Sequence, residues 1–405
     1  MNKLIEAHGI GPHRARYVAE SALAKFSQED IRRILSQLET LPQIPGSNNP
    51  CGPVFNRYSP FPIWVHVLLW SIRSMGIVCL LPIQAGAAAV LLARGRFAPI
   101  WKQIPRPSIE LVSWASEFDT FIKAPVKLVE ESIQRGAALC VNGNGKFSIR
   151  SAGYAVLSHV WGETMGWQTP HAWGPVELPL RRKGIPMAHF RRFFDRCDAE
   201  WLWVDFIAMP EVLEDMDAAE KDRMEGLRIG VINCLRSIYA KSEKVVVLDT
   251  LLLRLKTRSP IDVAVALCLS FWMTRLWTWV EARLAPKVIV KTEDWSIDLD
   301  SVLELLGKTV LNEEHRYHGV LRHLWTLRQE TINLLDISTL MESVCIGCAS
   351  RFTDVEIDTG RALYPLLGLR WEFGWDLEQG FRKIVNVYPE EAKWVMEFRQ
   401  IKFGL

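Results

Sequence analysis

From residue 150 onward, short apolar segments alternate with helical ones, and this alternation restricts the folds open to the chain more than any other feature. Continuous apolar strands separated by helices predict a parallel sheet that is covered on both faces. In such a sheet, ligands bind at the carboxyl ends of the strands. The expected elements are strands at 154–160, 201–207, 244–249 and 287–291 and helices at 187–197, 217–242 and 261–283.

The rest of the chain divides by composition. Residues 45–60 are dense in Pro, Gly, Asn and Ser, which is typical of a linker. The uncharged run from Ser74 to Ala93 is long enough to span a bilayer, but its proline and glycines suit buried helices about as well. The predicted organisation is a helical N-terminal segment at 1–44, a linker with apolar helices at 45–100 for which membrane association is one of two open alternatives, a helical connector at 101–149, an α/β core at 150–300 and a helical C-terminal region at 301–405.

Charge and cysteine content limit the classes of partner. The chain has 48 basic and 46 acidic residues, a formal net charge of +2, and so no general field that would attract nucleic acid. Its eight cysteines are scattered, which indicates reduced thiols and a cytoplasmic protein. Cys345 and Cys348 form one CxxC without a second pair, so no metal site is expected. Membrane association is left open for 61–93.

The end of the first expected strand is one candidate site. Ser158, His159, Trp161 and Gly162 follow one another there, and the glycine permits a tight turn close to a ligand. Neighbours on a strand point to opposite faces, so Ser158 and His159 are not expected to act on each other as nucleophile and base. At the end of the second strand, Asp205 either caps a loop or helix or binds a ribose hydroxyl.

The stretch from Phe271 to Ala285 sets three tryptophans around Glu281. On a helix, Glu281 lies one turn beyond Trp277, and Arg275 is spaced for a cation–π contact with Trp279. A carboxylate beside an aromatic wall suits a sugar oxocarbenium ion, because the ring excludes water while the carboxylate faces the positive charge. The alternative is a structural Glu281 paired with an arginine. No Gly-rich nucleotide motif is present, so no bound cofactor is expected.

Five segments in chain order, at 154–163, 201–209, 234–249, 271–285 and 351–369, together resemble the heterokaryon incompatibility (HET) domain of fungal proteins. The family's forms are a Leu-Ser strand ending in Trp-Gly, a Leu-Trp-x-Asp strand, an Ile-Tyr helix end leading into a strand, and an Arg-x-Trp-Thr-x-x-Glu helix. The matching segments are "YAVLSHVWGE" (154–163), "WLWVDFIAM" (201–209), "CLRSIYAKSEKVVVLD" (234–249), "FWMTRLWTWVEARLA" (271–285) and, for a later stretch, "RFTDVEIDTGRALYPLLGL" (351–369).

The resemblance implies a fold and a function. HET domains drive programmed cell death after non-self recognition and are distantly similar to TIR domains, a doubly wound, flavodoxin-like α/β fold in which some members cleave NAD. It implies that Glu281 is catalytic and that Ser158, His159, Trp161, Gly162, Asp205, Arg275 and Trp277 line the site, with NAD as the substrate. A second expectation is a non-catalytic module that acts through self-association or a protein partner. The chain has Ile207 to Pro210 where the family has a polar turn, and this favours the second expectation.

Overall fold

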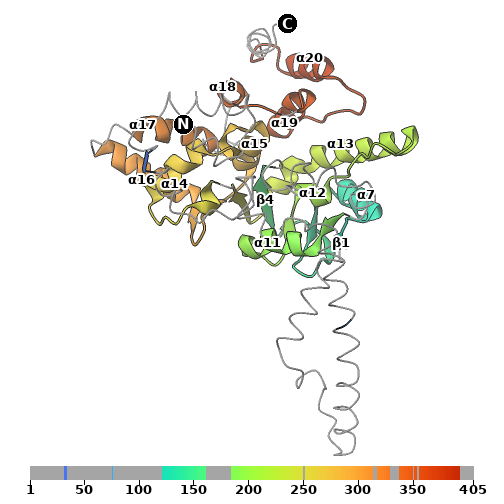
Figure 1. Ribbon diagram of the computed structural model, residues 1–405. Helices are drawn as coiled ribbons and strands as arrows, with labels where there is room; N and C mark the ends of the chain where they lie inside the picture. Colours follow the sequence, from blue (N-terminus) through green and yellow to red (C-terminus); the bar gives the residue numbers. More distant parts are fainter. Residues whose placement is uncertain are drawn as a thin grey trace, which may run out of the picture. The chain divides into compact units, whose positions relative to one another are not determined.

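The structure is a computed structural model in which the described residues form two compact units (Figure 1). The first unit holds 32–33, 124–160, 193–249, 251–312, 317–328, 337–349, 351–353 and 355–392, and the second holds 75, 121–123 and 184–192.

Seven strands of the first unit form one mixed sheet, in the order β3-β2-β6-β4-β7-β8-β9. The four central strands, from β6 to β8, run parallel, and the strands added at both edges run antiparallel. The chain therefore has the α/β class that its alternating pattern predicts. The strands are β2 (Ala138–Val141), β3 (Phe147–Arg150), β4 (Ala155–His159), β6 (Leu202–Trp203), β7 (Lys244–Leu248), β8 (Val288–Lys291) and β9 (Ser296–Asp298).

Helix boundaries follow local capping. The Asp217 side chain accepts from the Glu220 backbone N–H at 2.8 Å where α13 begins, and Ser259 precedes Pro260, the first residue of α14. The described helices are α7 (Val126–Arg135), α11 (Met187–Cys197), α12 (Asp205–Ala208), α13 (Ala218–Ala240), η3 (Leu252–Arg254), α14 (Pro260–Leu269), η4 (Trp272–Thr274), α15 (Leu276–Leu284), α16 (Leu299–Leu311), α17 (His318–Arg328), α18 (Ile337–Ala349), α19 (Ile357–Leu367) and α20 (Leu377–Val387).

Helix α15 is central to the packing of the first unit. It contacts β4 and α13, while α7 packs on the outer part of α13 (Figure 1). The helices after β9 then cover this layer, because α19 packs on both α13 and α15 and α17 packs on α14, α15 and α16. Every residue of α15 except Trp277 is buried, so its polar side chains need partners inside the protein.

The prediction of a single helix at 261–283 is wrong. The chain leaves α14 at Ser270, whose hydroxyl donates to the Leu267 carbonyl at 2.6 Å and accepts from the Met273 N–H at 3.2 Å. The Trp272 N–H donates to the Asp249 carboxylate, also at 3.2 Å. These bonds divide the segment into α14, η4 and α15, because they satisfy backbone groups that a continuous helix would pair internally.

Two other expectations need correction. The connector at 101–149 is not wholly helical, because its described part contains β2 and β3, which pair as an antiparallel hairpin and extend the sheet. The strand expected at 201–207 is only β6, since the chain turns into α12 at Asp205. Each of the other three expected strands is present within one residue of its expected ends.

The second unit contains a short antiparallel pair formed by β1 (Phe121–Ile122) and β5 (Ile185–Pro186). Gly184 precedes β5 with a φ of +95°, and a Cβ there would lie 2.2 Å from the Ile122 carbonyl oxygen. Only glycine fits this position, because backbone stands where a side chain would begin.

None of the described helices combines the length and the apolar content that crossing a membrane requires. The segment 61–93, which the sequence suggests for membrane association, lies outside the described residues except for Met75. Most of 1–44 and all of 45–60 lie outside them as well.

Gly380 of α20 is expected to be intolerant of any side chain. A Cβ there would lie 2.3 Å from Cζ3 of Trp371, a buried ring with aromatic neighbours, so it cannot move aside cheaply. Gly380→Ala should lower the free energy of unfolding by about 1–3 kcal/mol in chemical denaturation. Gly307→Ala in α16 is the control, because nothing lies within 4 Å of its Cβ. The helix propensity of alanine should raise stability there by about 0.5–1 kcal/mol. Equal effects at both positions would contradict this packing.

Candidate functional site

Ser158 and His159 begin two separate groups of side chains at the carboxyl end of β4. The Ser158 hydroxyl donates to the Glu281 carboxyl of α15, and the His159 Nε2 lies 2.9 Å from the Asp205 carboxylate of α12. Strand alternation sends the two side chains to opposite faces, as the sequence predicts. The residues expected to form one site therefore lie on both sides of one strand.

Glu281 is a buried carboxyl held by hydroxyl groups. Its side chain is 7% exposed, and Ser158 donates to its Oε2. The Tyr239 hydroxyl, from α13, hydrogen-bonds the same carboxyl. Among the described residues its hydrogen bonds are to hydroxyls, so the predicted pairing with an arginine is not what holds this side chain.

Burial gives Glu281 an unusual charge state. Loss of hydration raises the pKa of the carboxyl from its ordinary value of 4.5 to about 8. The Ser158 and Tyr239 hydroxyls and the Arg275 charge oppose the rise, and the Asp205 charge adds to it. Glu281 is therefore mostly protonated at neutral pH. Such a displaced pKa is frequent at catalytic positions, although buried structural networks also produce it.

Trp272 and Asp249 connect this carboxyl to the end of β7. The Trp272 indole donates to the Ser158 hydroxyl at 2.7 Å. Asp249, the residue after β7, is fully buried and accepts from the backbone N–H groups of Leu251, Leu252 and Trp272. The carboxylate thus fixes the turn that places the indole against Ser158.

Asp249→Asn should loosen this turn. The amide keeps the shape of the side chain, but its NH₂ group cannot accept a hydrogen bond from a backbone N–H. We expect the free energy of unfolding to fall by about 1.5–3 kcal/mol, the range for a bond to a charged group. Urea denaturation measures it, with Asp294→Asn, at an exposed position in the turn between β8 and β9, as the control. An unchanged midpoint for Asp249→Asn would contradict the account.

The second group surrounds His159. Its imidazole lies edge-on to the Phe206 ring with centroids 5.0 Å apart, and Phe193 of α11 is 6.3 Å away. Asp205 also accepts from the Phe206 backbone N–H at 2.7 Å, as the first residue of α12. Asp205 therefore binds His159 and the N–H of its neighbour, while the cap position of α12 is Val204, which makes no side-chain cap hydrogen bond.

The remaining predicted residues are placed differently from expectation. The guanidinium of Arg275 lies 5.2 Å from the centroid of the Phe352 ring, and Trp279 instead receives Arg351 at 5.6 Å, so the predicted Arg275–Trp279 contact is wrong. Phe352 also bonds through its backbone to Thr274 and Leu276. These partners come from a segment far along the chain, which spacing within α15 cannot reveal.

Three further residues were predicted to line the site, and the structure does not place them in either group of side chains. Trp277 is half-buried on α15, and Trp161 and Gly162 lie outside the described residues. Across the described ranges, no group of three His, Cys, Asp or Glu side chains is arranged to hold a metal ion.

Comparison of the chain with protein-family models, with curated proteins and with solved structures finds no match.

Sequence reasoning missed Tyr239, Trp272 and Asp249 as members of the site. Tyr239 ends a long amphipathic helix, and Asp249 is the only charged residue among the apolar ones from Val245 to Leu253. A buried polar group in such a setting needs a partner, and this is the signal by which both could have been found. The direction of the Trp272 ring depends on the turn at η4, and nothing in the neighbouring sequence indicates it.

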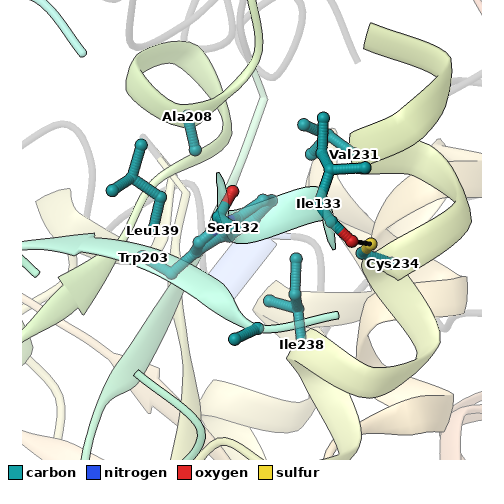
Figure 2. Close-up of a pocket in the computed structure, with 9 residues that line it drawn as sticks. Ser132, Ile133, Leu139, Trp203, Ala208, Val231, Cys234 and Ile238 are labelled. Atoms are coloured by element: carbon teal, nitrogen blue, oxygen red, sulfur yellow. Dashed lines mark hydrogen bonds between the residues drawn. The ribbon is translucent and has the colours of Figure 1, made fainter. Parts of the chain in front are cut away.

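A separate pocket lies among α7, β2, β6 and α13 (Figure 2). It encloses about 200 Å³, including space open to solvent, and its wall is mainly aliphatic. The space that a water-sized molecule can occupy is only about 10 Å³, which holds about one water and is far below the range of about 300–1,000 Å³ that is usual for ligand sites. None of its lining residues is charged, so a nucleotide is not assigned to it. They are Ser132, Ile133, Ala137, Leu139, Trp203, Ala208, Val231, Cys234 and Ile238.

Proposed function

We propose that this chain is a HET-like effector of programmed cell death or of non-self and immune signalling, and that it cleaves NAD at the nicotinamide–ribose bond through Glu281. The proposal includes a doubly wound, TIR/flavodoxin-like arrangement of the α/β core. It also includes action in the cytoplasm through self-association or a protein partner.

Strand order supports the fold part of the proposal. The parallel strands follow one another in the chain as β4, β6, β7 and β8, but β4 lies between β6 and β7 in the sheet. This is the order of flavodoxin-like folds, which bind ligands where the first and third strands diverge. Here those strands are β4 and β7, and Ser158 and Asp249 stand at their carboxyl ends.

One observation carries the enzymatic part: the Glu281 carboxyl is buried beside this strand end, and its hydrogen bonds within the described part of the chain are to hydroxyls and not to a cation. Burying such a group is costly, and an aliphatic residue would fill the space more cheaply. In the reaction, the bond between ribose C1′ and the nicotinamide nitrogen breaks, and its electron pair leaves with the ring. Water adds to C1′ and loses a proton. The ionised Glu281 would stabilise the intervening ribosyl cation.

A second function is favoured by the low exposure of the same side chain. Two hydroxyl partners and 7% exposure suit a glutamate that fixes α13, α15 and β4 in place. In that case the chain is a non-catalytic module that signals by assembly, as its apolar turn from Ile207 to Pro210 also suggests.

Incubation of the purified protein with NAD tests the proposal. Free nicotinamide should accumulate with time. The rate of release should be proportional to protein concentration, or should increase more steeply than the concentration if self-association completes the site. The assay is run on monomer and on cross-linked or crowded protein. No release in either form would reject the enzymatic proposal and leave the assembly module.

A further inference from the structure

Three polar side chains from three elements form a continuous hydrogen-bonded relay. The Trp272 Nε1 of η4 donates to Ser158 Oγ of β4 at 2.7 Å, and Ser158 donates to Glu281 Oε2 of α15. Trp272 and Ser158 are completely buried. Water therefore cannot replace either of them as a partner.

The direction of the first bond in the relay is fixed by the chemistry of the indole. An indole N–H donates and never accepts, so the Ser158 oxygen must be its acceptor. Ser158 donates its single proton to Oε2. Because the carbonyl oxygen of a carboxylic acid is the better acceptor, the proton of a protonated Glu281 is then favoured on Oε1. Donation by the indole also polarises the serine hydroxyl and strengthens the bond that it makes to the carboxyl.

We propose that Trp272, acting through Ser158, is a positioning residue that fixes the orientation of the Glu281 carboxyl and the oxygen that bears its proton. The consequence for catalysis rests on the proposed function, but the relay itself does not. Asp249 supports it by holding the Trp272 backbone N–H at 3.2 Å.

Other charged and titratable groups that face Glu281 also affect its ionisation. Asp205, from α12, is negatively charged and disfavours ionisation of Glu281, while Arg275, at the start of α15, favours it. Tyr239, from α13, is the second hydroxyl donor, and burial raises its own pKa well above the ordinary value. Tyr239 therefore remains protonated while Glu281 titrates.

Variants that remove one group at a time test the relay. Ser158→Ala should move the pH at which Glu281 ionises upward by about 1 pH unit, since a bond to the charged form is lost. Trp272→Phe keeps a large ring and should move it upward by about 0.5 pH unit, through weaker donation by Ser158. The double variant should shift no further than Ser158→Ala, because Trp272 acts through the serine.

Trp279→Phe is the matched control. It is also a buried indole, but its Nε1 donates to the Thr326 carbonyl at 3.0 Å, away from Glu281. This variant should lose stability and leave the ionisation of Glu281 unchanged. Ionisation is read from the pH dependence of stability, with each variant compared with the same variant carrying Glu281→Gln. It is read a second time from the pH profile of nicotinamide release.

The unaltered protein provides an independent measurement if a variant does not fold. The indole N–H resonance of Trp272 should shift with pH at the same midpoint as Glu281. An invariant resonance, an additive shift in the double variant, or no shift in Trp272→Phe would overturn the relay. The pH dependence of stability and the Trp272 resonance are both measured without NAD. If no nicotinamide is released, the proposed function is rejected, but these two measurements still test the relay.

Discussion

Replacing Glu281 by glutamine is expected to remove a pH-dependent loss of stability that the wild-type protein undergoes between pH 4.5 and about 8. In this interval the carboxyl is ionised in the unfolded chain but protonated in the folded one. Unfolding then releases a proton, so stability falls as pH rises, by up to about 1.4 kcal/mol per pH unit. Below pH 4.5 the contribution is fully present, and above about 8 it is lost.

The comparison is made by chemical denaturation at several pH values between 4 and 9. Relative to the wild type, Glu281→Gln should gain stability across the interval, on the order of 4 kcal/mol in total. Glu304→Gln, on the exposed side of α16, is the control and should follow the wild type closely. Parallel curves for wild type and Glu281→Gln would mean that the carboxyl does not stay protonated in the folded protein.

The same substitution should nearly abolish NAD cleavage. Glutamine keeps the size of the side chain and can still accept from Ser158, but it carries no negative charge to oppose the ribosyl cation. Removing an electrostatic group of this kind lowers the rate by about 100-fold or more. Nicotinamide release measures it, and the retained fold of Glu281→Gln separates loss of chemistry from loss of structure. Full activity in this variant would exclude Glu281 as the reacting group.

The parts of the fold that could be predicted are those with a local cause. β4 and β7 are continuous apolar runs, and α11 and α13 have a clear helical period or length, so their bounds agree with expectation within two residues. The break at Ser270 was missed because the apolar period continues across it, and one of the three bonds that make it involves Asp249, which is distant in sequence. The β2–β3 hairpin was missed because β3 is a short, half-buried edge strand with little apolar signal.

The candidate site also contains residues that could be predicted from the sequence and residues that could not. Glu281 and Ser158 could be named from the resemblance, and strand alternation correctly separated Ser158 from His159. Tyr239 and Trp272 could not be named, since their ring directions depend on how α13 and η4 pack against β4. The partner of Arg275 is Phe352, which comes from a segment that spacing in one helix cannot reveal.

The charge state of Glu281 during the reaction is the central claim, and the pH profile of nicotinamide release tests it most directly. The rate should rise about tenfold per pH unit below pH 8, as the carboxyl ionises, and level off above it. In Glu281→Gln this rise should disappear and the residual rate should be low. A rate that is absent at every pH, or a profile that Glu281→Gln leaves unchanged, would contradict it.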